Sequence, residues 1–148
     1  MSSKVEHPNA PRPDGLTPIH VAARCGHMEV IEFLAPKVEK PNAPKARLSG
    51  WTPISDGWTP IHFAVEYGHA EIVEFLAPLA ENPFAPRPNF DGGETPLLLL
   101  AANNDHEDVF KILLEIMPLK MILDFKKKHK KLYNKFSASP LVKLAKRY

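Results

Sequence analysis

The sequence lacks the features that mark secreted, disulfide-linked or membrane-spanning proteins. It contains one cysteine, Cys25, so no disulfide can form within the chain. Its first 15 residues are polar and proline-rich, without the apolar segment of a signal peptide. The longest apolar run, residues 96–102, is far shorter than the roughly 20 residues that cross a bilayer. These absences predict a protein of the cytoplasm or nucleus.

The sequence also lacks the motifs that commonly mark catalytic and cofactor sites. It has no nucleophile elbow, phosphate-binding loop, dinucleotide fingerprint or HExxH zinc motif. Each of the two second helices carries a pair of glutamates three residues apart, Glu29 with Glu32 and Glu71 with Glu74. This spacing is more typical of a solvated helix face than of an acid–base pair. We therefore expect neither enzymatic activity nor a cofactor.

Charge is distributed unevenly along the 148 residues. Residues 1–118 hold 9 Lys and Arg against 16 Asp and Glu, a net charge of −7. Residues 119–148 hold 10 against 1, a net charge of +9, and the whole chain carries +2. An acidic body with a basic C-terminal segment indicates how the protein interacts with charged partners, and does not specify a fold.

One long segment of the chain occurs twice. Residues 15–36 (GLTPIHVAARCGHMEVIEFLAP) and 57–78 (GWTPIHFAVEYGHAEIVEFLAP) agree at 14 of 22 positions without a gap. A degenerate third copy opens at residues 93–97 (GETPL). The fragment KVEHPNAP at 4–11 resembles KVEKPNAP at 37–44, so it matches the end of a preceding unit. Self-similarity of this length predicts an array of stacked units.

Each full copy carries the signals of two short helices. Thr17 can cap the first helix, and Pro18 fits its first position, where the missing N–H costs nothing. Gly26 provides the left-handed residue that ends it, and Pro36 ends the second helix. Apolar residues at i, i+1, i+3 and i+4 predict that each second helix packs between two neighbours: Val30, Ile31, Phe33 and Leu34, then Ile72, Val73, Phe75 and Leu76, then Val109, Phe110, Ile112 and Leu113.

The spaced pattern G-x-T-P-I-H-x-A-A-x-x-G-H-x-E-V-I-x-x-L resembles the ankyrin repeat and covers roughly residues 4–118. The resemblance implies an all-α ankyrin-repeat solenoid, in which helix-turn-helix pairs stack and loops called fingers project between them. The expected divisions are a partial repeat at 1–11 and repeats at about 14–44, 56–86 and 91–118, together forming a domain over 1–118. The second helices should be short, because Leu-Ala-Pro replaces the usual longer ending.

Two places depart from the regular repeat. The motif GWTPI occurs at 50–54 and again at 57–61, and only the second copy is in frame, with Thr59 before the helix. The first copy should loop out, either for a function or as a neutral duplication that a loop tolerates at small entropic cost. The third unit has one extra residue, which we place in the run 97–100, and residues 104–106 (NDH) replace the Gly-His turn. That turn should be less well made, although Asn tolerates the left-handed conformation.

The histidines and the cysteine of the first repeat suggest a zinc site, but the second copy argues against it. It keeps the two histidines and has Tyr67 where the first has Cys25, so the thiolate is lost while the frame persists. In the resembled family these histidines are structural. We therefore expect no metal.

The positions at which the two good copies differ are the candidates for partner binding. The resemblance implies that fingers and first helices line a concave face that docks a protein, with aromatic side chains as anchors. Trp58 and Tyr67 are expected to be exposed, whereas Phe63 either joins them or fills a gap between repeats. Phe84 and Phe90 would extend the apolar edge. The candidate residues are Leu16, Val21, Arg24, Cys25, Arg47, Trp51, Trp58, Phe63, Glu66, Tyr67, Asn103 and Asn104.

The basic segment after residue 118 is predicted to form a helix over about residues 119–136. A faint Ser-Pro-Leu start at 139–141 could make it a degenerate half-repeat. Its lysines fit a solvated tail, a nuclear-import or nucleic-acid contact, a membrane contact opposite Met121 and Phe125, or a segment that folds back on the acidic body. The lysines concerned are Lys126, Lys127, Lys128, Lys130 and Lys131.

The main hypothesis is therefore a scaffold that binds a partner protein, and the alternative is a nucleic-acid- or chromatin-associated accessory protein. With an incomplete first repeat, the chain is also expected to self-associate through its N-terminal edge or to belong to a longer array.

Overall fold

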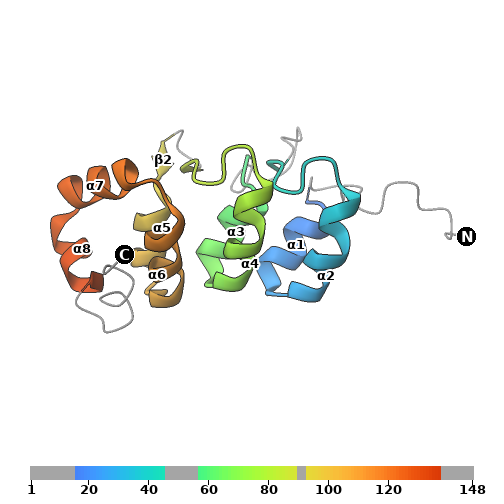
Figure 1. Cartoon of the computed structure of the whole chain (residues 1–148), viewed down its shortest axis with the longest axis horizontal. Coiled ribbons are helices and arrows are strands. Elements are labelled where there is room, and N and C mark those ends of the chain that lie inside the picture. Colours follow the sequence, from blue (N-terminus) through green and yellow to red (C-terminus); the bar gives the residue numbers. More distant parts are fainter. Residues whose placement is uncertain (1–15, 46–56, 90–92, 138–148) are drawn as a thin grey trace, which may run out of the picture.

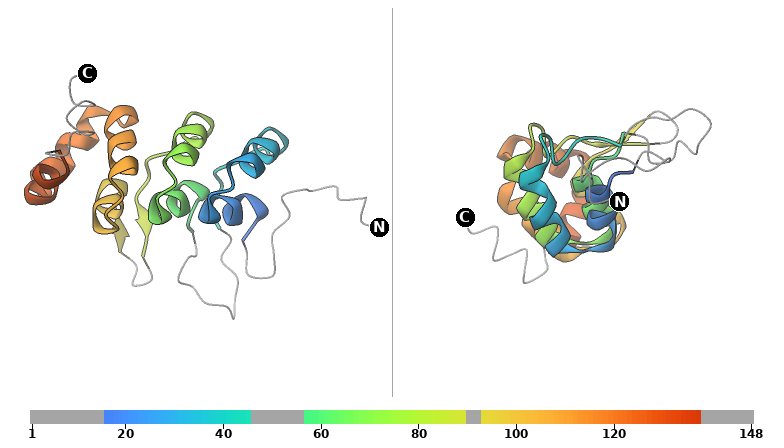
Figure 2. Two further views of the ribbon diagram at one scale, coloured as in Figure 1. Left: turned by 90° about the horizontal axis from the view of Figure 1, so that it is seen from below. Right: turned by 90° about the vertical axis from the view of Figure 1, so that its right-hand side faces the viewer.

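A computed structural model describes residues 16–45, 57–89 and 93–137. Helix pairs follow one another along the long axis of the molecule (Figure 1), and the left view of Figure 2 shows the same order from below. Two short 3₁₀ turns, η2 (Ala35–Lys37) and η3 (Ala77–Leu79), follow the second helices of the first two pairs. The pairs are α1 (Pro18–Cys25) with α2 (Met28–Leu34), α3 (Pro60–Tyr67) with α4 (Ala70–Leu76), α5 (Leu97–Asn103) with α6 (Glu107–Ile116), and α7 (Leu119–Lys128) with α8 (Lys130–Ser137).

Fingers connect the first helix pair to the second and the second pair to the third. In the first finger, the Lys45 N–H donates to the Trp58 carbonyl at 2.6 Å, and the Gly57 N–H donates to the Lys45 carbonyl at 3.0 Å. In the second finger, β1 (Arg87–Pro88) pairs antiparallel with β2 (Glu94–Thr95). Backbone hydrogen bonds therefore close the base of each finger beside the start of the next first helix.

The first two helix pairs begin with the same cap. The Thr17 hydroxyl accepts from the His20 N–H at 3.3 Å, and His20 Nδ1 accepts from the Thr17 N–H at 3.2 Å. Thr59 and His62 repeat this arrangement at 3.1 and 2.9 Å. This reciprocal cap satisfies two of the N–H groups that a helix start leaves unpaired. The caps confirm that the in-frame Thr-Pro pair at 59–60 starts α3; the surplus copy at 50–54 lies outside the described residues.

Glycine ends α1 and α3 for a steric reason. Gly68 has φ of 84°, and an added Cβ would lie 2.7 Å from His106 Nδ1 of the next repeat. Gly26 has φ of 80° and meets the ring of His69 in the same way. Each glycine thus ends a helix and leaves room for the histidine that stacks the following repeat upon it.

Gly68→Ala should therefore lower the free energy of unfolding by about 2 kcal/mol or more, because it forces a left-handed alanine against the His106 ring. Urea unfolding followed by circular dichroism measures this change. Glu74→Ala, an exposed site on α4, is the control and should shift the free energy by no more than about 0.5 kcal/mol. Equal effects of the two substitutions would contradict the packing described.

The third repeat begins one residue later than the Thr-Pro pair predicts. Pro96 is the N-cap of α5, and the Leu100 N–H donates to its carbonyl just as Val21 donates to Thr17. The extra residue is therefore taken up before the helix, where Thr95 joins β2, and not within 97–100 as predicted. At the other end, Asp105 and not Asn adopts the left-handed conformation, with φ of 59°.

The last two helices close the C-terminal end of the stack. The predicted single helix over 119–136 is wrong, because the chain breaks at His129, where φ is −130° and ψ is 54°. The break lets two aromatic side chains converge on α6: the Phe125 ring lies 6.1 Å and the Phe136 ring 5.1 Å from the ring of Phe110. A straight helix would separate Phe125 from Phe136 by about 16 Å along its axis.

The N-terminal end of the stack is less well covered. We define the N-terminal edge as Val30 and Phe33 on α2, which are 39% and 61% exposed. Their counterparts on α4 are the buried Ile72 and the half-buried Phe75. Within the described residues, the prediction that α2 packs between two neighbours is met on one side only, because Val30 and Phe33 are exposed on the other. Among the described residues, no helix has both the length and the apolar character to cross a membrane.

Candidate partner-binding site

The structure divides the predicted site residues into a buried set and an exposed set. Leu16, Trp58 and Phe63 belong to the hydrophobic core. Trp58 is only 7% exposed, so the expectation that it projects to solvent is wrong. Phe63 fills the space between α1 and α3, where its ring meets His20 edge-on at 5.9 Å. Neither aromatic side chain is available to a partner in this arrangement.

Trp58 is buried because the second finger covers it. Its ring centroid lies 4.9 Å from that of Phe63, and its indole Nε1 donates to the Pro88 carbonyl at 3.0 Å. The Arg87 guanidinium lies over the indole, 4.6 Å from the ring centroid. Trp58 therefore joins the base of one finger to the next finger, which makes it a structural residue.

Arg87 is a central residue of this surface that the sequence interpretation missed. One guanidinium nitrogen binds the Glu66 carboxylate at 2.7 Å, and the other donates to Asn89 Oδ1 at 2.8 Å. Its Nε is buried and has no hydrogen-bond partner within the described residues. The signal was present in the sequence, since the Ala-Pro pairs at 10–11, 43–44 and 85–86 are each followed by a basic residue: Arg12, Lys45 and Arg87.

The exposed set lies at the ends of the first helices. We define the first-helix row as Cys25, Tyr67 and Asn104, which occupy the same position just before the left-handed residue of each repeat. All three are exposed, and Tyr67 has half of its surface open to solvent. Because α1, α3 and α5 follow one another along the stack (Figure 1), the three positions of the row recur from one repeat to the next. Around it lie the half-buried Val21, Arg24 and Glu66 and the exposed Asn103.

Four histidines hold this framework in place. His20 Nε2 donates to the Ala43 carbonyl at 2.9 Å, and His62 Nε2 donates to the Ala85 carbonyl at 2.8 Å, so each ring joins a first helix to its finger. His69 and His106 reach back to the preceding first helix, to the carbonyls of residues 24 and 66, at 3.0 Å each. Within the described residues, no group of three or more potential metal ligands occurs.

Burial shifts the titration of the two capping histidines. Removal from water lowers the pKa of His20 from 6.5 to about 4, and it lowers the pKa of His62 to the same value. A neutral ring fits the geometry, because Nε2 donates while Nδ1 accepts. The structural role predicted for these histidines is thus supported by their hydrogen bonds and by their charge state.

Other candidates fall outside these two sets. Arg47, Trp51 and Phe90 lie outside the described residues. The five lysines on α7 and α8, Lys126, Lys127, Lys128, Lys130 and Lys131, are all exposed. Their role in nuclear import or nucleic-acid contact stays a prediction.

A family model described as ankyrin repeats, in three copies, matches residues 3–83 and 47–122. The chain belongs to the ankyrin-repeat family. The ankyrin-repeat solenoid predicted from the sequence is thereby confirmed, and the mostly helical architecture agrees with it. A comparison with curated proteins found no match. Ankyrin repeats are generally modules for protein–protein interaction, and the family is typically not enzymatic.

Proposed function

We propose that this ankyrin-repeat chain binds a partner protein on the first-helix row and its flanking charged residues. The observation that carries the proposal is the exposure of Tyr67 at the centre of the row, where the adjacent repeats have Cys25 and Asn104. These equivalent positions share one backbone environment and differ in chemistry. Packing within the chain does not require those differences, which suits a surface that distinguishes partners.

The chemistry of the row indicates what kind of partner surface fits it. Tyrosine provides a large, rigid contact area with a polar tip, the combination enriched at protein interfaces. Arg24 and Glu66, each one residue before the row in adjacent repeats, add half-buried side chains of opposite charge. A matching partner would present an apolar pocket for the tyrosine, with an acidic group towards Arg24.

The Arg87–Glu66 ion pair supports the proposal by holding one flank of the row rigid. Glu66 is fixed by Arg87 at 2.7 Å, and Arg87 is in turn fixed by Asn89 and by the Trp58 ring. Side chains that are already ordered lose little rotamer entropy when a partner docks. The fixed pair therefore contributes to specificity on the finger side of the row.

Affinity purification from cell extract, followed by quantitative mass spectrometry, tests the proposal. Tyr67→Ala should reduce recovery of the specific partner by about tenfold or more, because it removes the central aromatic side chain. Glu74→Ala, on the exposed side of the second helix in the same repeat, should leave recovery unchanged. Equal recovery with wild type and Tyr67→Ala would contradict binding at this row.

A further inference from the structure

The N-terminal edge carries a protruding aromatic side chain between two charges. Phe33 is the most exposed aromatic residue among those the structure describes. The Lys37 ammonium lies 3.9 Å from the centroid of its ring, and the exposed Glu32 is its neighbour in sequence. His27 is exposed nearby, whereas its counterparts in the next two repeats bond to a preceding helix. This end of the stack therefore offers the kind of surface that another repeat normally covers.

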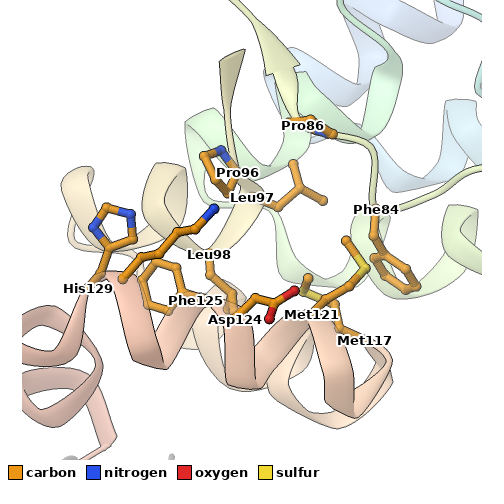
Figure 3. Close-up of a pocket in the computed structure, with 11 residues that line it drawn as sticks. Phe84, Pro86, Pro96, Leu97, Leu98, Met117, Met121, Asp124, Phe125 and His129 are labelled. Atoms are coloured by element: carbon orange, nitrogen blue, oxygen red, sulfur yellow. The ribbon is translucent and has the colours of Figure 1, made fainter.

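An apolar pocket lies at the opposite end of the molecule. It opens between the second finger, the start of α5 and the helix α7, and Figure 3 shows its side chains converging from these three elements. In the first two repeats a histidine joins the first helix to the returning finger, whereas the third repeat is followed directly by α7. Its walls are made by Phe84, Pro86, Leu97, Leu98, Met121 and Phe125.

The size of the pocket indicates what it can hold. Its volume is about 190 Å³. Pockets for drug-sized ligands are larger, roughly 300–1,000 Å³. A dry apolar cavity of about 150 Å³ holds one benzene molecule. The pocket is therefore of the right size to hold a single aromatic side chain.

The charges around the pocket complement those around Phe33. Asp124 and Lys128 lie on its lining, four residues apart on α7. Phe33 likewise has one charge of each sign beside it, since Lys37 lies over its ring and Glu32 precedes it in sequence. A docked Phe33 can thus bring Glu32 towards Lys128 and Lys37 towards Asp124, so that both pairs are attractive.

We propose that this chain associates head to tail, with Phe33 of one copy seated in the apolar pocket of the next. The two contact surfaces lie at opposite ends of the stack, so the contact is heterologous and generates open chains of molecules instead of a closed dimer. Pairing of two N-terminal edges is disfavoured because it would bring the exposed Glu29 and Glu32 of both copies together.

Sedimentation velocity of the full-length protein over increasing concentration tests this contact. The mean sedimentation coefficient should rise continuously with concentration, without a plateau at dimer. Phe33→Ala should raise the concentration needed for association by about tenfold or more, because it removes the side chain that fills the pocket. Leu79→Ala, which truncates an exposed apolar side chain outside both proposed sites, should leave association unchanged.

A charge exchange tests the register of the contact. E32K places like charges beside Lys128, and K128E places like charges beside Glu32, so each variant alone should associate several-fold more weakly than wild type. An equimolar mixture of the two should recover association, because every contact between one variant and the other pairs opposite charges. Both residues are exposed, and unchanged circular dichroism and melting confirm intact folding.

Three outcomes overturn the proposal. The first is a wild-type monomer at every concentration, as expected if residues 1–15 of the same chain or a different protein cover Phe33. The second is an equal loss of association for Phe33→Ala and Leu79→Ala. The third is a mixture of the two charge variants that associates no better than either alone.

Discussion

Lowering the pH from 7 to 5 should reduce the free energy of unfolding by about 3 to 4 kcal/mol through His20 and His62 together. Each has a pKa of about 4 in the folded chain, against 6.5 for an exposed histidine. The unfolded chain therefore binds protons first as the pH falls. The stabilising contribution is fully present above pH 6.5 and is lost between pH 6.5 and 4, at up to about 1.4 kcal/mol per pH unit for each ring.

Urea unfolding at pH 7, 6 and 5 measures this dependence, over a range in which ordinary carboxyl groups stay largely ionised. The double variant His20→Gln, His62→Gln is the control. It should be less stable than wild type at pH 7, because both reciprocal caps and both finger contacts change. It should also lose most of the slope between pH 7 and 5. An unfolding free energy of wild type that stays level over this range would contradict the burial of neutral rings.

Trp58→Ala should lower the free energy of unfolding by about 3 to 5 kcal/mol, the usual range when a large buried aromatic side chain is truncated. The substitution removes the contact with Phe63 and the support under Arg87, and it leaves the Pro88 carbonyl without its indole donor. For a chain of this size the loss should lower the melting temperature by about 10 °C. Differential scanning calorimetry or denaturant unfolding measures the change.

Tyr67→Ala is the matched aromatic control for Trp58→Ala. Tyr67 ends the helix that follows Trp58 and is half exposed, so its truncation should change the free energy of unfolding by less than about 0.5 kcal/mol. The two substitutions should therefore have opposite effects: Trp58→Ala should mainly reduce stability, whereas Tyr67→Ala should mainly reduce binding. A small loss for Trp58→Ala together with a large loss for Tyr67→Ala would contradict the positions assigned to both.

The helix pairs could be predicted from the sequence because their signals are local. Thr17 and Pro18 start α1 and Gly26 ends it within nine residues, and the second copy repeats the same signals in the same frame. The short second helices α2 and α4 follow from the Leu-Ala-Pro ending, which turns into 3₁₀ geometry in both. Helix starts and ends that depend on local capping and turn residues can be predicted without knowledge of the tertiary structure.

The candidate site was less predictable because its decisive contacts join distant segments. The Trp58 indole bonds to a carbonyl 30 residues away, and Arg87 reaches back 21 residues to Glu66. A comparison of the two repeats identifies positions that differ, but it cannot tell a residue that faces solvent from one that the next finger covers. The break at His129 has a similar cause, since it depends on the fit of Phe125 and Phe136 around Phe110.

The exposure of Phe33 illustrates a third limit of the repeat pattern. A stripe of apolar residues shows that a helix has two faces to cover, and it does not show whether a neighbour is present on each side. On α4 the pattern is satisfied from both sides, while on α2 one side is open in the described chain. Equivalent positions are therefore packed in one repeat and exposed in the other.

Site-specific photo-crosslinking tests the central claim, that a partner protein docks on the first-helix row, most directly. A photoreactive amino acid replaces Tyr67, Cys25 or, as the control on the second helix, Glu74, and adducts formed in cells are identified by mass spectrometry. The proposal predicts that positions 67 and 25 capture the same protein and that position 74 does not. Capture of that protein at position 74 with none at positions 67 and 25 would contradict it.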